Sequence, residues 1–270
     1  MHHSWSPRLW TPAGGAETPL VTALTVGVTT AKHPECKRGV ATNVAAALSR
    51  HSAVSARVCL VDADPLTLDV TTRLAVAGPV LEDFARPSPP PIGRLGHLTS
   101  PMMSVLPCGG GPIGKVRLAM ERALPELRAG FDVVVCDLPV GPTGPGLAVG
   151  GRLDLLDWLV LAVTPTPTAV AAASHFLEHF RTAQDRGDVG GVQLAVVCTG
   201  DESSADLHHQ EIESMLGVVV TARVPQLWGR AEPNLGFGPA LAIPEVDDAV
   251  YDLFVSLRSD RDHRRALLHR

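Results

Sequence analysis

Three aspartates stand at the ends of short apolar runs that are typical of buried strands. Asp62 and Asp64 follow residues 57–61, and Asp137 follows residues 131–136. In a parallel sheet covered on both faces, ligands bind at the carboxyl ends of the strands. Carboxylates at such ends are a usual means of holding hydrated Mg²⁺ beside a phosphate group. Each aspartate alone is also a common helix cap or turn former, so the three have to be weighed together.

Two lysines five residues apart form the second group. Only three of the 23 Lys and Arg residues are lysine, and two of these three are Lys32 and Lys37. They lie between a strand-like run at 21–28 and an alanine-rich helical pattern at 41–50, where a phosphate-binding loop would stand. The loop lacks the regular pattern G-x-x-x-x-G-K-[ST], whose glycines let backbone N–H groups surround phosphate oxygens. From the residues alone, a solvated loop with incidental charge stays open.

The elements that must position these side chains alternate along the chain. Near-continuous apolar strands followed by helical patterns predict an α/β fold, a single doubly wound, mostly parallel sheet with helices on both faces. The expected strands are 21–28, 57–61, 103–106, 131–136, 158–163, 192–198 and 218–222, and the expected helices are 41–50, 116–129, 168–185 and 246–257. We expect one domain at 21–257, an extended lead-in at 1–20 and an arginine-rich tail at 258–270. The proline-rich stretch 86–101 is expected to be a surface excursion rather than a domain boundary.

Composition excludes several classes of protein. With 45% hydrophobic residues, 19% charged residues and a net charge of −5, most of the 270 residues can bury a core, and strong non-specific DNA binding is disfavoured. The longest apolar runs, such as 158–163, are far shorter than the roughly 20 residues of a membrane span. No signal peptide is evident, and the five cysteines show no C-x-x-C pair, which favours a cytoplasmic protein. Cys59, Cys136 and Cys198 are expected to be small buried apolar residues.

Four segments carry a resemblance to a known family. They are RVCLVDADPLTLDV, FDVVVCDLPVG, LDWLVLAVTPTPTAVAAASHFLEHF and VPQLWGRAEPNLGFGPALAIPE, in this order. Together they resemble the ParA/MinD superfamily of deviant Walker ATPases over about residues 20–257, which implies a P-loop NTPase-like fold of the SIMIBI type. In that family the loop reads K-G-G-x-G-K-T-T, followed by N-L-A-x-A-L. Residues 43–48 match the second motif, and this match puts Lys32 on the signature lysine and Lys37 on the Walker A lysine without a gap.

The loop between the two lysines departs from the family pattern. His33, Pro34 and Cys36 stand where the family has glycines, and Pro34 removes one N–H donor. Arg38 and Gly39 stand where the family has two hydroxyl residues, so a protein ligand for Mg²⁺ is lost. Arg38 either supplies a fixed charge to phosphate oxygens or blocks the site. The expected consequence is slow or absent hydrolysis.

The resemblance implies a role for each candidate site residue. Lys37 would hold the β- and γ-phosphates, Lys32 would reach the nucleotide of a second subunit, and Asp64 would orient the attacking water. Asp62 and Asp137 would support Mg²⁺. The remaining nucleotide contacts would come from Arg38, Gly39, Thr199 and Pro225. Thr199 follows Cys198 in the region where the family has an adenine-binding Asn, and Pro225 marks the second adenine loop.

A phosphate-binding loop that has lost its glycines and hydroxyl residues, within an otherwise preserved family pattern, looks like the CpaE/TadZ branch and the septum-site-determining, MinD-like relatives. This resemblance implies a homodimeric positioning or partitioning factor that uses ATP and Mg²⁺ and organises pole, septum or secretion machinery through protein partners. The arginines of 258–270 would allow weak contact with membrane or DNA, because the tail has too few apolar residues for stable insertion. The alternative is a nucleotide-free pseudo-ATPase scaffold. A metal-insertion or reductase ATPase is disfavoured because such proteins use paired cysteines.

Two weaker patterns remain. Gly109, Gly110 and Gly111 are expected to let the chain turn after a strand. His208 and His209, with nearby glutamates, are expected to lie on a solvated helix face rather than to bind a metal, because adjacent side chains on a helix point apart.

Overall fold

The computed structural model describes residues 23–32, 37, 39–50, 56–99, 102–141, 155–189, 192–199, 206–224 and 253. Within these residues the chain forms one eight-stranded sheet of order β3-β4-β2-β5-β1-β6-β7-β8. The strands are β1 (Leu24–Thr30), β2 (Val58–Asp62), β3 (Gly96–Thr99), β4 (Met102–Leu106), β5 (Val133–Asp137), β6 (Trp158–Val163), β7 (Gln193–Thr199) and β8 (Val220–Val224). Every neighbouring pair is parallel except β3 and β4. The predicted mostly parallel α/β sheet is therefore confirmed.

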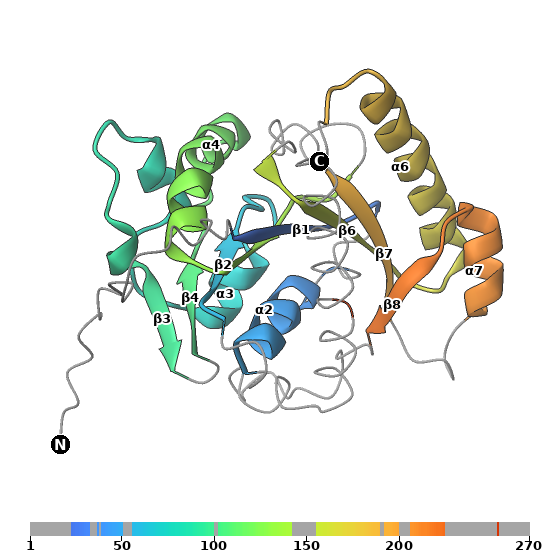
Figure 1. The fold of residues 1–270 in the computed structure, drawn as a ribbon, viewed down its shortest axis with the longest axis horizontal. Helices are drawn as coiled ribbons and strands as arrows, with labels where there is room; N and C mark the ends of the chain where they lie inside the picture. The colour runs from blue at the N-terminus through green and yellow to red at the C-terminus, as the bar shows by residue number, and fades with distance from the viewer. Residues whose placement is uncertain are drawn as a thin grey trace, which may run out of the picture.

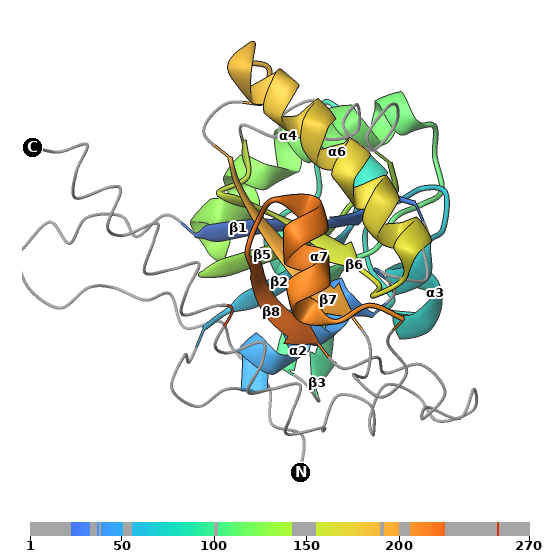
Figure 2. The ribbon, with the colours of Figure 1, turned by 90° about the vertical axis from the view of Figure 1, so that its right-hand side faces the viewer.

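Helices cover both faces of the sheet (Figure 1). They are α2 (Val40–Arg50), α3 (Asp69–Leu74), α4 (Ile113–Gly130), α6 (Pro167–Asp185) and α7 (His209–Leu216), with the short 3-10 helices η1 (Leu81–Ala85) and η2 (Ile92–Arg94). Figure 1 shows α2 on one side of the sheet and α4 and α6 on the other, and Figure 2, seen from the β8 edge, shows α7 beside β8. Among the described residues, no helix combines the length and the apolar character that crossing a membrane requires.

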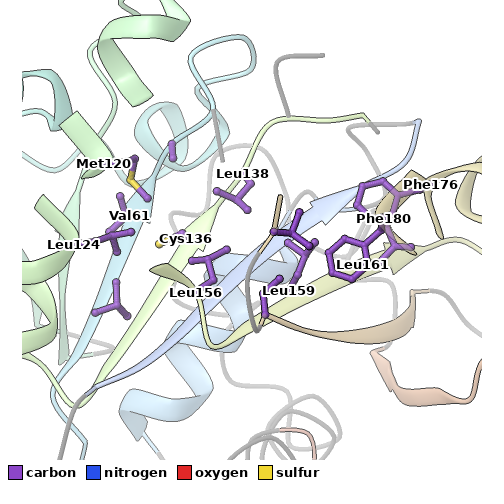
Figure 3. Packing of buried hydrophobic residues seen from close by; sticks show 14 of the residues in the cluster. Val61, Met120, Leu124, Cys136, Leu138, Leu156, Leu159, Leu161, Phe176 and Phe180 are labelled. Carbon is purple, nitrogen blue, oxygen red and sulfur yellow. The ribbon is translucent and has the colours of Figure 1, made fainter. Parts of the chain in front are cut away.

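The core forms two layers because successive strand residues point to opposite faces. Leu60, Val135 and Val160 pack with α2 in one layer. Their neighbours Val61, Cys136 and Leu161 pack in the other layer with the helices of the opposite face. Figure 3 shows this second layer, in which Met120 and Leu124 of α4 and Phe176 and Phe180 of α6 lie over the strands. Central strands with two covered faces explain why the sequence shows continuous apolar runs there.

The predicted positions differ from the structure mainly at element ends. The strand expected at 57–61 extends to Asp62, so this aspartate is the last residue of β2 rather than the first of a loop. The expected surface excursion 86–101 contains an edge strand, β3, which is short and antiparallel to β4. The last expected helix, 246–257, lies outside the described residues except for Leu253, which is helical and buried.

The predicted burial of cysteines is confirmed. Cys59 and Cys136 are fully buried in β2 and β5, and Cys198 is buried in β7. Burial raises the pKa of the Cys136 thiol to about 12, and the charge of Asp137 acts in the same direction. These thiols are therefore protonated and inert at neutral pH.

Candidate functional site

Two of the predicted carboxylates meet at the carboxyl edge of the sheet. Strands β2 and β5 are parallel neighbours, and Asp62 and Asp137 are direct partners in their register. β1 flanks β5 on its other side and pairs Val28 with Asp137. The chain leaving these strands is tied back to the sheet, since Ala63 N donates to Asp137 O and Leu138 N donates to Val28 O, each at 2.9 Å.

Lys37 lies inside this edge of the sheet, just before α2. Its side chain is 1% exposed, and Nζ lies 2.8 Å from Asp64 Oδ2 and 3.0 Å from Asp137 Oδ1. Nζ also donates to the backbone carbonyl of Leu138. An ammonium group has three N–H donors, so every donor of Lys37 has an acceptor within the chain. We call Lys37, Asp64 and Asp137 the lysine triad.

The triad is held by charge in a buried setting. Burial opposes the charged form of Lys37, but Asp137 and Asp64 outweigh this and raise its pKa. Burial likewise opposes ionisation of Asp64, yet Lys37 and the hydrogen bonds from Thr67 and Leu66 lower its pKa. Burial raises the pKa of Asp137 to about 7, against the effect of Lys37.

The two carboxylates of the triad differ because their surroundings differ. Asp64 Oδ1 accepts from the N–H groups of Leu66 at 3.0 Å and Thr67 at 3.3 Å, and Oδ2 accepts from the Thr67 hydroxyl at 2.8 Å. Among the described residues, Asp137 has Lys37 as its side-chain donor and lies near the negative charges of Asp62 and Asp64. Asp64 is therefore a fixed anion, whereas Asp137 is the carboxyl group that exchanges a proton near neutral pH.

Asp62 has partners of its own. Its Oδ1 accepts from Asp64 N at 3.1 Å, and its Oδ2 accepts from Thr71 N at 2.9 Å and from the Thr71 hydroxyl at 2.7 Å. Burial raises the pKa of Asp62 in spite of these hydrogen bonds. The side chain is fully buried, so its orientation is set by the turn into α3.

The chain was compared with family models, with curated proteins and with solved structures. No protein-family model matches the sequence, and no curated protein matches it. Among solved structures, the chain is similar to the MinC–MinD cell division complex of Aquifex aeolicus, with 17% identity, 88% of this chain and 96% of that chain covered, and a TM-score of 0.66. It is also similar to a ParA-family ATPase of Chlorobium tepidum, with 17% identity, coverage of 86% and 97%, and a TM-score of 0.64.

A third similar structure is cobyrinic acid a,c-diamide synthase of Mycobacterium smegmatis with a bound ATP analogue and magnesium. Identity is 20%, coverage is 85% of this chain and 94% of that chain, and the TM-score is 0.61. The chain has the MinD/ParA fold. At these identities the likeness concerns the fold, and each side chain has to be judged on its own geometry.

Within the MinD/ParA fold, the structure brings together four of the predicted site residues, Lys37, Asp62, Asp64 and Asp137. Gly39 precedes α2 with a φ of +75°, a conformation that glycine adopts at little cost, while Lys32 is exposed. Thr199 ends β7 on the far side of β6 from β1. Its hydroxyl is buried, with no hydrogen-bond partner found for it in the structure as described. Arg38 and Pro225 lie outside the described residues.

The residues of this MinD/ParA fold suit a hydrated magnesium ion. Asp62, Asp64 and Asp137 are three buried carboxyl groups at this edge, two of them paired with Lys37, and carboxylate oxygens are the ligands that Mg²⁺ prefers. Thr42 in α2 adds a buried hydroxyl for which the described residues supply no partner. The described residues contain no cluster of three or more His, Cys, Asp or Glu placed to ligate a metal directly. Asp62 and Asp137 would therefore contact the ion through its water shell, as Mg²⁺ usually permits.

Sequence reasoning did not find Thr67, Thr71 or the role of Glu82. The signal for Thr67 was present, because a threonine three residues after an aspartate is a common turn pattern. Glu82 is 3% exposed and accepts from Gly109 N and Gly111 N, each at 2.7 Å, although it lies 27 and 29 residues away in the chain. No local pattern joins these groups.

The histidine pair lies at the start of α7. His208 precedes α7, and its backbone N–H donates to Glu211. His209 Nε2 lies 3.0 Å from Glu213 Oε1 one turn along the helix.

Proposed function

We propose that the chain is a nucleotide-binding positioning factor that binds ATP with Mg²⁺ at the carboxyl edge of β1, β2 and β5 and hydrolyses it slowly or not at all. The observation that carries this proposal is the buried ammonium of Lys37 beside Asp64 and Asp137. Lysine is rarely fully buried unless it is paired, and the strand ends just before a helix are where a phosphate-binding loop places its lysine. The synthase with a similar fold binds an ATP analogue and magnesium at its own site, which supports the proposal.

In this proposal the basic and acidic residues of the site bind different parts of the ligand. Lys37 would hold the phosphate oxygens, and Gly39 would let the backbone turn closely before α2. Asp62 and Asp137 would hold waters of the ion. Bound Mg²⁺ would supply positive charge to the phosphate oxygens and to the carboxylates that Lys37 leaves.

Phosphate binding requires an exchange at Lys37, because all three N–H donors already have acceptors. Removing one partner from a buried ion pair costs about 3–5 kcal/mol when nothing replaces it. A divalent ion near Asp64 and Asp137 offsets that cost. We therefore expect nucleotide binding to be markedly stronger with Mg²⁺ than without it.

Slow hydrolysis is supported by Asp64. Asp64 accepts four hydrogen bonds from the chain, two at each carboxylate oxygen, so it has no lone pair left to orient a water molecule without rearrangement. Arg38, at the position of the expected Mg²⁺-binding hydroxyl, supports the same expectation.

The positioning role rests on the likeness to MinD and ParA-family structures. We propose a homodimer in which the exposed Lys32 reaches the second nucleotide, with protein partners at the pole, septum or secretion apparatus, as in the CpaE/TadZ branch. The unit would be the domain 21–257, and the arginines of the tail 258–270 would add weak contact with membrane or DNA.

The second candidate is a nucleotide-free scaffold. The completeness of the lysine triad favours it, since the chain itself supplies an acceptor for each N–H of the Lys37 ammonium. Such a protein would keep the fold and bind partners only.

A titration separates the two candidates. ATP and ADP affinities are measured with and without Mg²⁺ on the wild type, Lys37→Ala, Lys37→Arg and Lys115→Ala, with folding checked by circular dichroism. Lys115 is exposed on α4 and serves as the matched control. We expect binding that Lys37→Ala abolishes and Lys115→Ala leaves unchanged. No binding at millimolar ATP would leave the scaffold, and binding unaffected by Lys37→Ala would place the nucleotide elsewhere.

A further inference from the structure

A line of hydrogen bonds leads from Asp62 away from the lysine triad. The first link is Thr71 in α3, which gives Asp62 Oδ2 both its backbone N–H at 2.9 Å and its hydroxyl at 2.7 Å. The second link is the backbone N–H of Cys108, which donates to the Thr71 hydroxyl oxygen at 2.8 Å. Both links lie on groups that are absent from the proposed ATP contacts.

The Cys108 amide fixes the direction of the Thr71 hydroxyl. A hydroxyl has one hydrogen to donate and two lone pairs that accept. Because Cys108 N–H occupies a lone pair, the hydrogen turns to an acceptor, and Asp62 Oδ2 at 2.7 Å is closer than Cys108 O at 3.3 Å. Asp62 is therefore oriented by a donor that is itself oriented.

The backbone that follows the Cys108 amide is in turn held by a buried carboxylate. Glu82 Oε2 accepts from Gly109 N and Oε1 from Gly111 N, each at 2.7 Å, and Cys108 Sγ lies 3.5 Å from Oε1. A Cβ atom at Gly109 or Gly111 would come within 3.1 or 3.0 Å of the carboxylate. The glycines after β4 thus serve close approach of Glu82, which gives them a purpose beyond turning the chain. We call Glu82 with Cys108–Gly111 the glycine turn.

We propose that Thr71 is a positioning residue that presents Asp62 to hydrated Mg²⁺, and that Glu82 fixes the glycine turn from which Thr71 takes its orientation. This inference rests on the proposed nucleotide function. Residues that orient the groups around a metal change metal affinity by about 10–100-fold when they are removed. Thr71 meets that description because its hydroxyl donates to Oδ2 of the fully buried Asp62 carboxylate.

The test separates positioning from simple structural support. The affinity for a fluorescent ADP analogue is measured in Mg²⁺ and in EDTA for the wild type, Thr71→Val, Thr71→Ser and Thr72→Val. Valine keeps the shape of threonine without the donor, serine restores the donor, and Thr72 is the exposed neighbour on the same helix. We expect Thr71→Val to reduce the gain in affinity from Mg²⁺ by about tenfold and to leave the EDTA value unchanged. Thr71→Ser and Thr72→Val should retain the gain.

The outcomes are distinct. Equal losses in Mg²⁺ and EDTA, or a full Mg²⁺ gain in Thr71→Val, would overturn the inference and leave the nucleotide function intact. A wild type that binds nucleotide in neither condition would overturn both.

The role of Glu82 is tested separately. Glu82→Gln should speed amide hydrogen exchange at Cys108 and lower the Mg²⁺ gain by a smaller factor than Thr71→Val. Faster exchange at Cys108 with an unchanged Mg²⁺ gain would remove Glu82 from the inference.

Discussion

The lysine triad and the glycine turn both hold buried carboxylates, by different means. In the triad, Asp64 and Asp137 face the ammonium of Lys37, a charge at the end of a flexible chain. In the glycine turn, Glu82 faces backbone N–H groups of Gly109 and Gly111, which the fold fixes in place. An ammonium can move from one anion to another, whereas a backbone N–H cannot. The first arrangement suits exchange with a ligand, and the second suits permanent support.

Lys37→Ala should produce the largest loss of stability, because it leaves two buried carboxylates without their cation. We expect unfolding to become easier by about 3–5 kcal/mol. The measurement is denaturant unfolding at pH 7. Lys115→Ala, at an exposed position, should stay within about 0.5 kcal/mol of the wild type. A loss below about 1 kcal/mol for Lys37→Ala would show that the triad does not hold the fold.

Glu82→Ala should cost less, about 2 kcal/mol, because it removes two charge-assisted hydrogen bonds but leaves no opposing charge buried. The same unfolding measurement applies. If Glu82→Ala were as harmful as Lys37→Ala, the contrast between a movable and a fixed partner would lose its energetic basis.

Gly111→Ala should destabilise by about 1–2 kcal/mol, since the new methyl group would lie 3.0 Å from Glu82 Oε1. Gly114 is the matched control: it lies in α4 and has no atom within 4 Å of an added Cβ. Gly114→Ala should therefore stabilise by up to about 1 kcal/mol through helix propensity. Equal effects at both positions would contradict the close approach of Glu82.

The pH dependence of stability sharpens the comparison further. The pKa of Asp137 is about 7 in the folded protein, against the ordinary value of 3.8 that applies to the unfolded chain. Between these two pH values the folded protein keeps a proton that the unfolded chain releases. The contribution of this protonated carboxyl group to stability is complete below about pH 4 and is lost as the pH rises through 7. Asp137→Asn should flatten this part of the pH profile, measured by unfolding at pH 4.5, 5.5, 6.5 and 7.5. An unchanged slope would assign the titration to another group.

The sequence predicted the sheet well because its central strands are buried on both faces and therefore continuously apolar. β3 was missed because a four-residue edge strand next to a proline-rich stretch has no such run. Lys37 lies among the strand-end aspartates, with Asp64 and Asp137 as its direct partners. Thr71 and Glu82 could not be found, since their contacts with Cys108 and Gly111 span distant parts of the chain and involve backbone atoms.

The short segment between Asp64 and Thr71 is held at both ends by carboxylates and carries strain between them. Asp64 anchors Thr67 at one end, and Asp62 anchors Thr71 at the other. Between them, Leu68 adopts a left-handed backbone with φ 50°, which costs a residue with a side chain about 1–2 kcal/mol. A change of partner at Asp64 therefore acts on a turn that is already under tension. Leu66, which is 69% exposed on that turn, would then change its position at the molecular surface.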